Sequence, residues 1–202
     1  APHCRIDVQD LDADFYAFSA HKAYGPNGVG GLYGKYSLLD TMPPYHGGGD
    51  MIEHVTFTKT TYAPPPLKFE AGTPAIADVI AMATALEYLM DKGLENITAY
   101  EHALTEYTLE AFKAIDRASF ISTPKHRAGI FSFNIEGIHS LDIGTMLDLK
   151  GVAIRTGHHC AEPALARCGT NTSARVSLGM YNNSDDIDRF ITALRDVIKM
   201  LS

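Results

Sequence analysis

Proline and glycine crowd residues 43–74, and this stretch constrains the fold more than any other part of the chain. It contains a double proline at 43–44, a triple glycine at 47–49 and a triple proline at 64–66. Proline fixes its own φ angle and lacks a backbone donor, so a regular helix or a central strand is excluded here. Irregular connections of this length are usually functional or form interfaces. We therefore predict an extended interface loop, anchored by apolar side chains along it: Phe57, Tyr62, Leu67 and Phe69.

The patterns on either side of this loop predict a poor stand-alone core for residues 1–97. Apolar runs at 14–19 and 29–35 are typical of strands. Between residues 75 and 92 apolar residues recur at helical spacing, and Gly93 then ends the helix. Two strands, one helix and a long loop bury too little apolar surface for an independent domain.

Residues 98–202 show the pattern of a compact α+β domain instead. Alternating apolar residues predict strands, and apolar residues at helical spacing predict helices. Ser184 is the predicted N-cap of the last helix, with Asp185 and Asp186 in its first turn. The expected order is a helix at 97–118, a strand at 130–135, a helix at 140–149, strands at 152–155 and 175–178, and a helix at 184–201.

Composition and charge exclude several classes of protein. Of the 202 residues, 46% are hydrophobic and 20% are charged, which is typical of a globular chain and excludes disorder. The net charge of −7 argues against nucleic acid or an anionic membrane surface as the main partner. The most apolar segment, residues 75–90, is interrupted by Asp78 and Glu87, so no membrane span is predicted.

The cysteines and the N-terminus indicate the compartment. Cys4, Cys160 and Cys168 are odd in number and form no Cys-x-x-Cys pair, which favours a reducing cytoplasm over a secreted disulfide framework. The first residues show no basic region followed by an apolar stretch, so no signal peptide is predicted. Because the chain starts at Ala1 without a methionine, we expect it to be a piece of a longer protein.

Lys22 is the first candidate for chemistry. It follows an apolar strand and precedes a loop rich in glycine and proline, where α/β enzymes often carry reactive groups. A lysine desolvated by neighbouring aromatic rings can form an imine with an aldehyde cofactor. Ser19 and His21 flank it and can donate hydrogen bonds to a phosphate. The alternative is an ordinary surface lysine.

The second candidate is Cys160, within the segment Arg-Thr-Gly-His-His-Cys-Ala-Glu-Pro at residues 155–163. A cysteine on a glycine-containing loop beside imidazoles and a guanidinium is in a setting that favours the thiolate. The alternative is a buried structural cysteine. A zinc site drawn from the histidines, Cys160 and Cys168 would have no standard ligand spacing, so no metal is predicted.

Arg155 and Arg175 each lie at the end of a short apolar segment. A guanidinium at the edge of a core usually has an anionic partner, because an unpaired buried charge is costly. The substrate carboxylate is one candidate partner, and a structural Asp or Glu is the alternative.

Three segments together resemble one known family. They are Ser-Ala-His-Lys-Ala-Tyr-Gly-Pro-Asn-Gly at 19–28, Phe-Glu-Ala-Gly-Thr-Pro at 69–74, and the segment at 155–163. In this order and spacing they resemble the group II, Suf-type cysteine desulfurases. These are pyridoxal 5'-phosphate enzymes of aminotransferase class V with fold type I. Group I members carry a longer cysteine loop, so the short loop here favours the Suf type.

The resemblance implies which residues hold the cofactor. Lys22 binds pyridoxal 5'-phosphate as an imine and later moves the α-proton of the substrate. Ser19 and His21 hold the cofactor phosphate. Thr73 contacts the same phosphate from the other subunit of a homodimer.

The resemblance also implies the reaction and the residues that carry it. Arg175 binds the carboxylate of L-cysteine in a bidentate pair, and Arg155 lines the same pocket. Cys160 attacks the substrate sulfur, which leaves L-alanine and a persulfide on the enzyme. His158 and His159 lie where either can tune that thiol, and the sequence leaves this choice open. The sulfur then passes to an acceptor protein of the Suf system for iron–sulfur cluster assembly in the cytoplasm.

The implied fold combines an α/β part with an α+β part. Residues 1–97 correspond to the C-terminal remnant of the large, parallel-sheet domain that binds the cofactor, at the edge of its sheet. Residues 98–202 correspond to the complete small α+β domain, which carries the cysteine loop. The aspartate that pairs with the pyridine nitrogen and the ring that stacks on the cofactor fall upstream of Ala1 in this family. We therefore expect the chain alone to bind the cofactor poorly and to be inactive.

Two other functions stay open from the sequence. A selenocysteine lyase or a related pyridoxal-phosphate-dependent C–S lyase would carry nearly the same motifs. A truncated, non-catalytic module for dimerisation or for docking the sulfur acceptor is the alternative from a different class.

Overall fold

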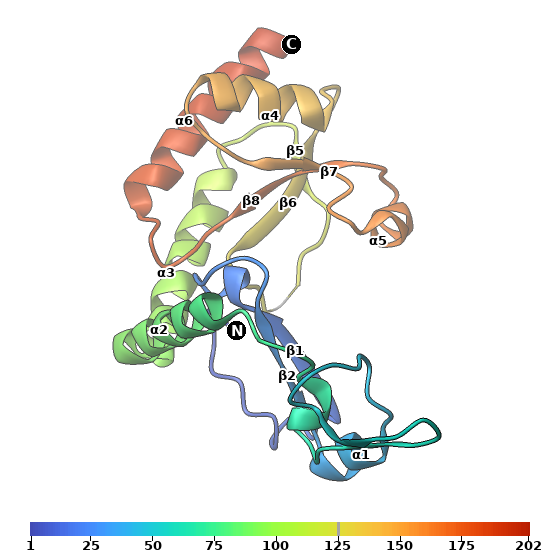
Figure 1. The fold of residues 1–202 in the computed structure, drawn as a ribbon. Coiled ribbons are helices and arrows are strands. Elements are labelled where there is room, and N and C mark those ends of the chain that lie inside the picture. Colours follow the sequence, from blue (N-terminus) through green and yellow to red (C-terminus); the bar gives the residue numbers. More distant parts are fainter. Residues whose placement is uncertain (125) are drawn as a thin grey trace. The chain divides into compact units, whose positions relative to one another are not determined.

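The structure is a computed structural model that describes residues 1–124 and 126–202 (Figure 1). It divides into two compact units, Ala1–Glu95 and Asn96–Ser202, which are called the first and the second unit. The sequence pattern placed the boundary between residues 97 and 98.

An antiparallel strand pair supports the lysine segment in the first unit. Strand β1 (Phe15–Ser19) pairs with β2 (Gly30–Gly34), so that Ser19 lies opposite Gly30. The glycines of β2 permit this close pairing, because a Cβ atom at Gly31 would lie 2.6 Å from the Phe18 ring. The 3-10 helix η1 (Ala20–Lys22) follows β1 directly.

The long proline- and glycine-rich loop contains more regular structure than the sequence predicts. Helix α1 (Tyr36–Thr41) precedes it, and it holds an antiparallel hairpin of β3 (Ile52–Val55) and β4 (Thr60–Tyr62). The Thr56 side chain closes the turn, since its Oγ1 donates to the Lys59 carbonyl at 2.9 Å and accepts from the Lys59 N–H at 2.9 Å. The 3-10 helix η2 (Leu67–Phe69) follows.

Helix α2 (Ile76–Lys92) completes the first unit and ends at Gly93, as predicted. Gly93 has a φ of +81°, a conformation that glycine adopts without strain. Within this helix only Leu89 is buried, while Ile80 and Met90 are each 63% exposed. In this chain α2 therefore presents much of its apolar surface to solvent.

The second unit is built on a four-stranded antiparallel sheet with the strand order β5-β6-β8-β7. Helices α3 (Leu94–Phe112), α4 (Ser140–Leu149) and α6 (Ser184–Leu201) contribute to one core with the inward face of the sheet (Figure 1). The strands are β5 (Ala118–Phe120), β6 (Ile130–Ile135), β7 (Arg155–Gly157) and β8 (Ser173–Ser177).

Side chains alternate across this sheet, and the alternation separates the core from the site. On β6, Phe131 and Phe133 are fully buried in the core, while Ser132 and Asn134 point to the other face. On β8, Ala174 and Val176 are buried and Arg175 lies between them. The face that carries Arg175 is therefore the face away from the apolar core.

Several boundaries differ from the sequence prediction, and three of them have a local reason. Helix α3 ends at Phe112 rather than at 118, because Arg117 adopts a left-handed φ of +66° and β5 begins at Ala118. Strand β7 begins later than expected, because the Val152 N–H donates to the Leu147 carbonyl and closes the end of α4. Asn183, rather than Ser184, caps α6 in a capping box with Asp186.

Helix α5 (Glu162–Arg167) was not predicted from the sequence. It is 6 residues long, too short for a periodic apolar pattern. A proline in its first turn is compatible with a helix start.

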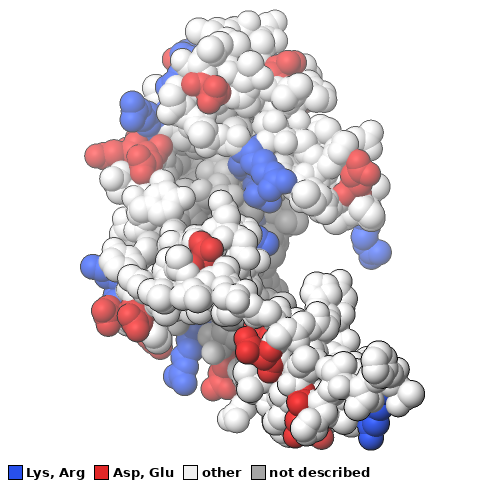
Figure 2. Space-filling model, viewed as in Figure 1, with Lys and Arg blue, Asp and Glu red and all other residues white. Residues whose placement is uncertain are grey.

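Surface and hydropathy fit a chain without a membrane-spanning helix in its described residues. Across residues 1–124 and 126–202, none of the helices combines the length and the apolar character that crossing a bilayer needs. On the face drawn in Figure 2, acidic and basic side chains are scattered in small groups of both signs.

Candidate active site

The predicted site residues fall into two groups, one in each unit. The first unit carries Ser19, His21, Lys22 and Thr73. The second unit carries Arg155, His158, His159, Cys160 and Arg175.

In the first unit, a tight turn presents Lys22 and His21 to solvent. Ala20 and Ala23 are fully buried and anchor the turn, while His21 and Lys22 are exposed. The N–H groups of Ala23 and Gly25 both donate to the Ala20 carbonyl, at 2.8 and 2.9 Å. Buried Ala20 and Ala23 therefore fix the backbone of the turn, and the Lys22 amine and the His21 imidazole stay accessible.

The donor set of this turn fits a phosphate-bearing aldehyde cofactor. Lys22 offers an exposed primary amine, which is the group that forms an imine with an aldehyde. Ser19 precedes the turn, and its hydroxyl makes no capping bond with η1, so it remains available to a phosphate. Thr73 is exposed on the loop after Gly72, whose φ is +78°.

In the second unit, the cysteine loop has an unusual backbone. Gly157 has a φ of +110°, His159 of +55° and Cys160 of +57°. A left-handed conformation costs a non-glycine residue about 1–3 kcal/mol, and such residues cluster at functional sites. The Ala161 N–H donates to the His158 carbonyl at 2.9 Å, which closes the turn and leads into α5. The Cys160 side chain is exposed on this loop.

Arg155 is the residue that contacts the cysteine sulfur. Its Nη2 atom donates to the Cys160 Sγ over 3.5 Å. The two histidines point elsewhere: His158 Nδ1 lies 2.8 Å from Glu162 Oε1, and His159 Nε2 contacts Ser173. Neither of these contacts is with the Cys160 sulfur. The prediction that one of the histidines tunes the thiol therefore has no direct contact to support it.

The two arginines lie side by side on neighbouring strands. Arg155 on β7 is directly opposite Arg175 on β8. Like charges at this spacing repel each other, and the Arg175 Nε atom is buried without a hydrogen-bond partner. Burial lowers the pKa of Arg175, Arg155 lowers it further, and the nearby Cys160 raises it. Such a pair is suited to an anion that would supply the missing acceptor.

The surroundings of His159 favour the neutral form of its ring. Burial lowers its pKa below the usual 6.5, the hydrogen bond to Ser173 opposes this, and the charges of Arg175, Arg155 and His158 add to the lowering. As the pH falls below 6.5, the unfolded chain takes up this proton before the folded chain does. The stability that His159 contributes is thus present above pH 6.5 and is lost as the pH falls through the lowered pKa.

His159→Gln is expected to reduce the loss of stability on acidification, because glutamine cannot take up a proton. Urea unfolding of the chain at about pH 7.5 and about pH 5 measures the change in unfolding free energy for both proteins. The wild type is expected to lose more stability than the variant between these conditions. An equal loss in both would contradict the assigned environment of His159.

Sequence analysis did not identify two residues of this site, Ser173 and Glu162. Glu162 is the first residue of α5 and meets His158 across a turn with two left-handed residues, so no helical spacing marks the pair in the sequence. Ser173 is distant in sequence from the cysteine loop and is fully buried, and no local motif marks it.

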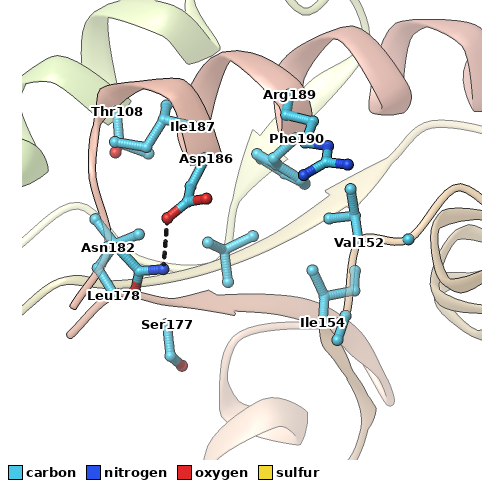
Figure 3. A pocket seen from close by; sticks show the side chains of 13 residues that line it. Thr108, Val152, Ile154, Ser177, Leu178, Asn182, Asp186, Ile187, Arg189 and Phe190 are labelled. Atoms are coloured by element: carbon cyan, nitrogen blue, oxygen red, sulfur yellow. Dashed lines mark hydrogen bonds between the residues drawn. The ribbon is translucent and has the colours of Figure 1, made fainter.

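A cavity of about 180 Å³ lies in the second unit, apart from the cysteine loop. Figure 3 shows Val152 and Ile154 on one side and the start of α6 on the other, with Asn182 bonded to Asp186. None of the predicted site residues lines it. In the described part of the chain, residues 1–124 and 126–202, no group of three His, Cys, Asp or Glu side chains is arranged to hold a metal ion.

Known proteins match this chain along nearly all of its length. The aminotransferase class-V family model matches residues 1–190. A cysteine desulfurase of Serratia proteamaculans is 48% identical over 200 residues, which are 98% of this chain and 49% of that protein. A probable cysteine desulfurase of Staphylococcus epidermidis is 45% identical over 203 residues, covering 100% of this chain and 49% of that protein.

A solved structure agrees with these sequence matches. The crystal structure of a cysteine desulfurase from Escherichia coli, in an S-sulfonic acid form, superimposes with a TM-score of 0.94 at 38% identity. The match covers 99% of this chain and 50% of that one, so the chain spans about half the length of the curated relatives it matches. The predicted resemblance to cysteine desulfurases of aminotransferase class V and the predicted mixed α/β fold are confirmed. The chain belongs to the aminotransferase class-V family.

Proposed function

We propose that this chain is the C-terminal portion of a pyridoxal-phosphate-dependent cysteine desulfurase of the Suf type. The observation that carries the proposal is the exposed Cys160, whose sulfur lies 3.5 Å from Arg155 Nη2 on a loop beside the cross-strand pair of arginines. A nucleophilic sulfur beside an anion-binding pair suits a substrate that carries both a sulfur atom and a carboxylate. The relatives named cysteine desulfurase support the same assignment.

In this proposal the first unit holds the cofactor. Lys22 would bind it through its Nζ atom, with Ser19 and His21 on its phosphate and Thr73 on the phosphate of the partner subunit in a homodimer. When bound, pyridoxal phosphate stores the electron pair released at the substrate α-carbon. Lys22 Nζ then serves as the base that removes and returns the α-proton.

The second unit supplies substrate binding and the nucleophile. Arg175 binds the carboxylate of L-cysteine, and its unpartnered Nε is the donor that this contact would satisfy. The Cys160 thiolate attacks the substrate sulfur, so that an S–S bond forms while the C–S bond breaks. The substrate carbon keeps the electron pair of the broken bond and takes up a proton, which gives L-alanine. Cys160 is left as a persulfide.

The persulfide needs a protein that accepts its terminal sulfur. An acceptor of the Suf system, working in the cytoplasm for iron–sulfur cluster assembly, is the partner we propose. An exposed Cys160 is accessible to such an acceptor.

The same proposal assigns a different role to each of the two regions of the chain. Residues 1–97 are the remnant of the large cofactor domain with its interface loop, and residues 98–202 are the small domain with the cysteine loop. The full-length protein, meaning the polypeptide that carries this chain together with an upstream region, would supply the partner of the pyridine nitrogen.

The 202-residue chain alone is accordingly expected to bind pyridoxal phosphate poorly or not at all. The exposed apolar side chains of α2 fit a first unit that lacks part of its surroundings. Absorbance spectroscopy of the chain with added cofactor measures this, with Lys22→Ala as the control. A visible band that appears with the wild type and disappears in Lys22→Ala would contradict the prediction.

The proposed activity is tested by alanine release from L-cysteine in the full-length protein, with L-selenocysteine assayed in parallel. Alanine from L-cysteine, increased by an acceptor protein, is the expected result. Release from L-selenocysteine alone would replace the proposal with a selenocysteine lyase. No release from either substrate would favour a non-catalytic module.

A further inference from the structure

His159 and Ser173 form a contact that connects the cysteine loop to the sheet. His159 Nε2 lies 3.0 Å from the carbonyl oxygen and 2.9 Å from the Oγ atom of Ser173. Ser173 is the first residue of β8 and is fully buried, so its position is fixed by the sheet. The contact therefore joins the cysteine loop to the four-stranded sheet.

The direction of this hydrogen bond follows from its acceptor. A carbonyl oxygen only accepts, so His159 Nε2 carries the hydrogen and donates it to Ser173. In the neutral ring the Nδ1 atom is then the acceptor, and it is buried without a hydrogen-bond partner. Neither ring nitrogen of His159 is thus engaged with the Cys160 sulfur, whose contact is Arg155.

The path of the chain shows what the contact does. Gly157, the last residue of β7, pairs with Ser173 across the sheet. Two residues later the backbone has turned into the left-handed region, and the His159 side chain returns to the same Ser173. The loop is therefore attached to Ser173 at two points, once through the backbone ladder and once through the imidazole. Cys160 follows directly after the second attachment.

Two successive left-handed residues need such support. His159 and Cys160 both have positive φ values, and neither is glycine. Each left-handed non-glycine residue costs about 1–3 kcal/mol and persists only where the surrounding structure enforces it. The contact between His159 and Ser173 is one such restraint, and it lies directly before Cys160 in the chain.

We propose that Ser173 and His159 are positioning residues, which hold Cys160 in its left-handed conformation beside Arg155. The proposal rests on the proposed desulfurase function, in which Cys160 must meet the substrate sulfur in a defined position. It assigns to His159 the task of a hydrogen-bond donor rather than of an acid or base. Ser173, which no sequence motif marks, becomes part of the site.

Glutamine and leucine at position 159 separate these two tasks. The Nε2 of glutamine is a donor at about the same distance from the backbone as the Nε2 of histidine, but it does not titrate at neutral pH. His159→Gln is therefore expected to keep kcat within about threefold of the wild type, while His159→Leu lowers kcat about thirtyfold or more. The KM for L-cysteine is expected to stay within about twofold in both, because the carboxylate contacts are not touched.

Ser173→Ala gives the second test. It removes the hydroxyl but leaves the carbonyl acceptor, so an intermediate loss of kcat, about three- to tenfold, is expected. Alanine fits the buried position without added volume. His102→Leu removes an exposed imidazole from α3 and serves as the matched control, with wild-type kcat.

Amide hydrogen exchange of the full-length protein tests the same proposal without any turnover. Exchange at residues 158–161 is expected to be faster in His159→Leu and in Ser173→Ala, and to match the wild type in His159→Gln. If the wild type releases no alanine, the proposed function fails. The exchange measurement still shows whether the contact between His159 and Ser173 holds the cysteine loop in place. Unchanged exchange in His159→Leu, or a loss of kcat in His159→Gln equal to that in His159→Leu, would overturn the proposal.

Discussion

Replacing Cys160 with alanine is expected to lower alanine release from L-cysteine by about a thousandfold or more in the full-length protein. The thiolate is the group that accepts the substrate sulfur, and no other side chain on the loop can replace it. Arg155, His158 and His159 offer nitrogen atoms, which cannot take up the sulfur as a persulfide.

Cys168 is the matched control for this substitution. It is exposed like Cys160 and lies at the other end of the same short helix, α5. Cys168→Ala is expected to keep the wild-type rate, because no motif or contact places it in the site. A rate in Cys160→Ala within tenfold of the wild type would show that the sulfur leaves by a route that does not use this cysteine.

Replacing Arg175 with lysine is expected to lower kcat/KM for L-cysteine by about 100-fold, equal to about 2.7 kcal/mol. Lysine keeps the positive charge but loses the fork of donors that matches a carboxylate. Arg175 lies opposite Arg155, and its buried Nε has no hydrogen-bond partner among residues 1–124 and 126–202, so the anion is the acceptor that is lost. Steady-state kinetics with L-cysteine measures the change.

The matched control for Arg175 is a guanidinium outside the site. Arg127 stacks over the rings of Phe120 and Phe131 in the second unit. Arg127→Lys is expected to leave kcat/KM unchanged. If Arg175→Lys also left kcat/KM unchanged, the substrate carboxylate would be bound elsewhere.

Sequence patterns predicted those elements whose signals are local. The spacing of apolar residues predicted helix α2, strand β6 and helix α6. Gly93 predicted where α2 ends. Helix α5 and the hairpin β3–β4 did not follow, because α5 is too short for a period and the hairpin is closed by the Thr56 side chain. A threonine that closes a turn looks like any other threonine in the sequence.

The candidate site was predictable in its composition but not in its contacts. The residue types of the loop pointed to Cys160 and to two histidines and an arginine near it. Which of them contacts the sulfur depends on the backbone of residues 157–160, where three left-handed φ values rotate the side chains. The buried partner of His159, Ser173, comes from a different strand and is brought there only by the sheet. Such long-range pairings carry no local signal.

The measurement that tests the central claim most directly is mass spectrometry of the full-length protein after a single exposure to L-cysteine without reductant. The account predicts that the peptide containing Cys160 gains the mass of one sulfur atom, and that the peptides containing Cys4 and Cys168 do not. The gain should disappear in Cys160→Ala and on treatment with a thiol. Release of alanine with no added sulfur on the Cys160 peptide, or with the sulfur on another cysteine, would contradict the account.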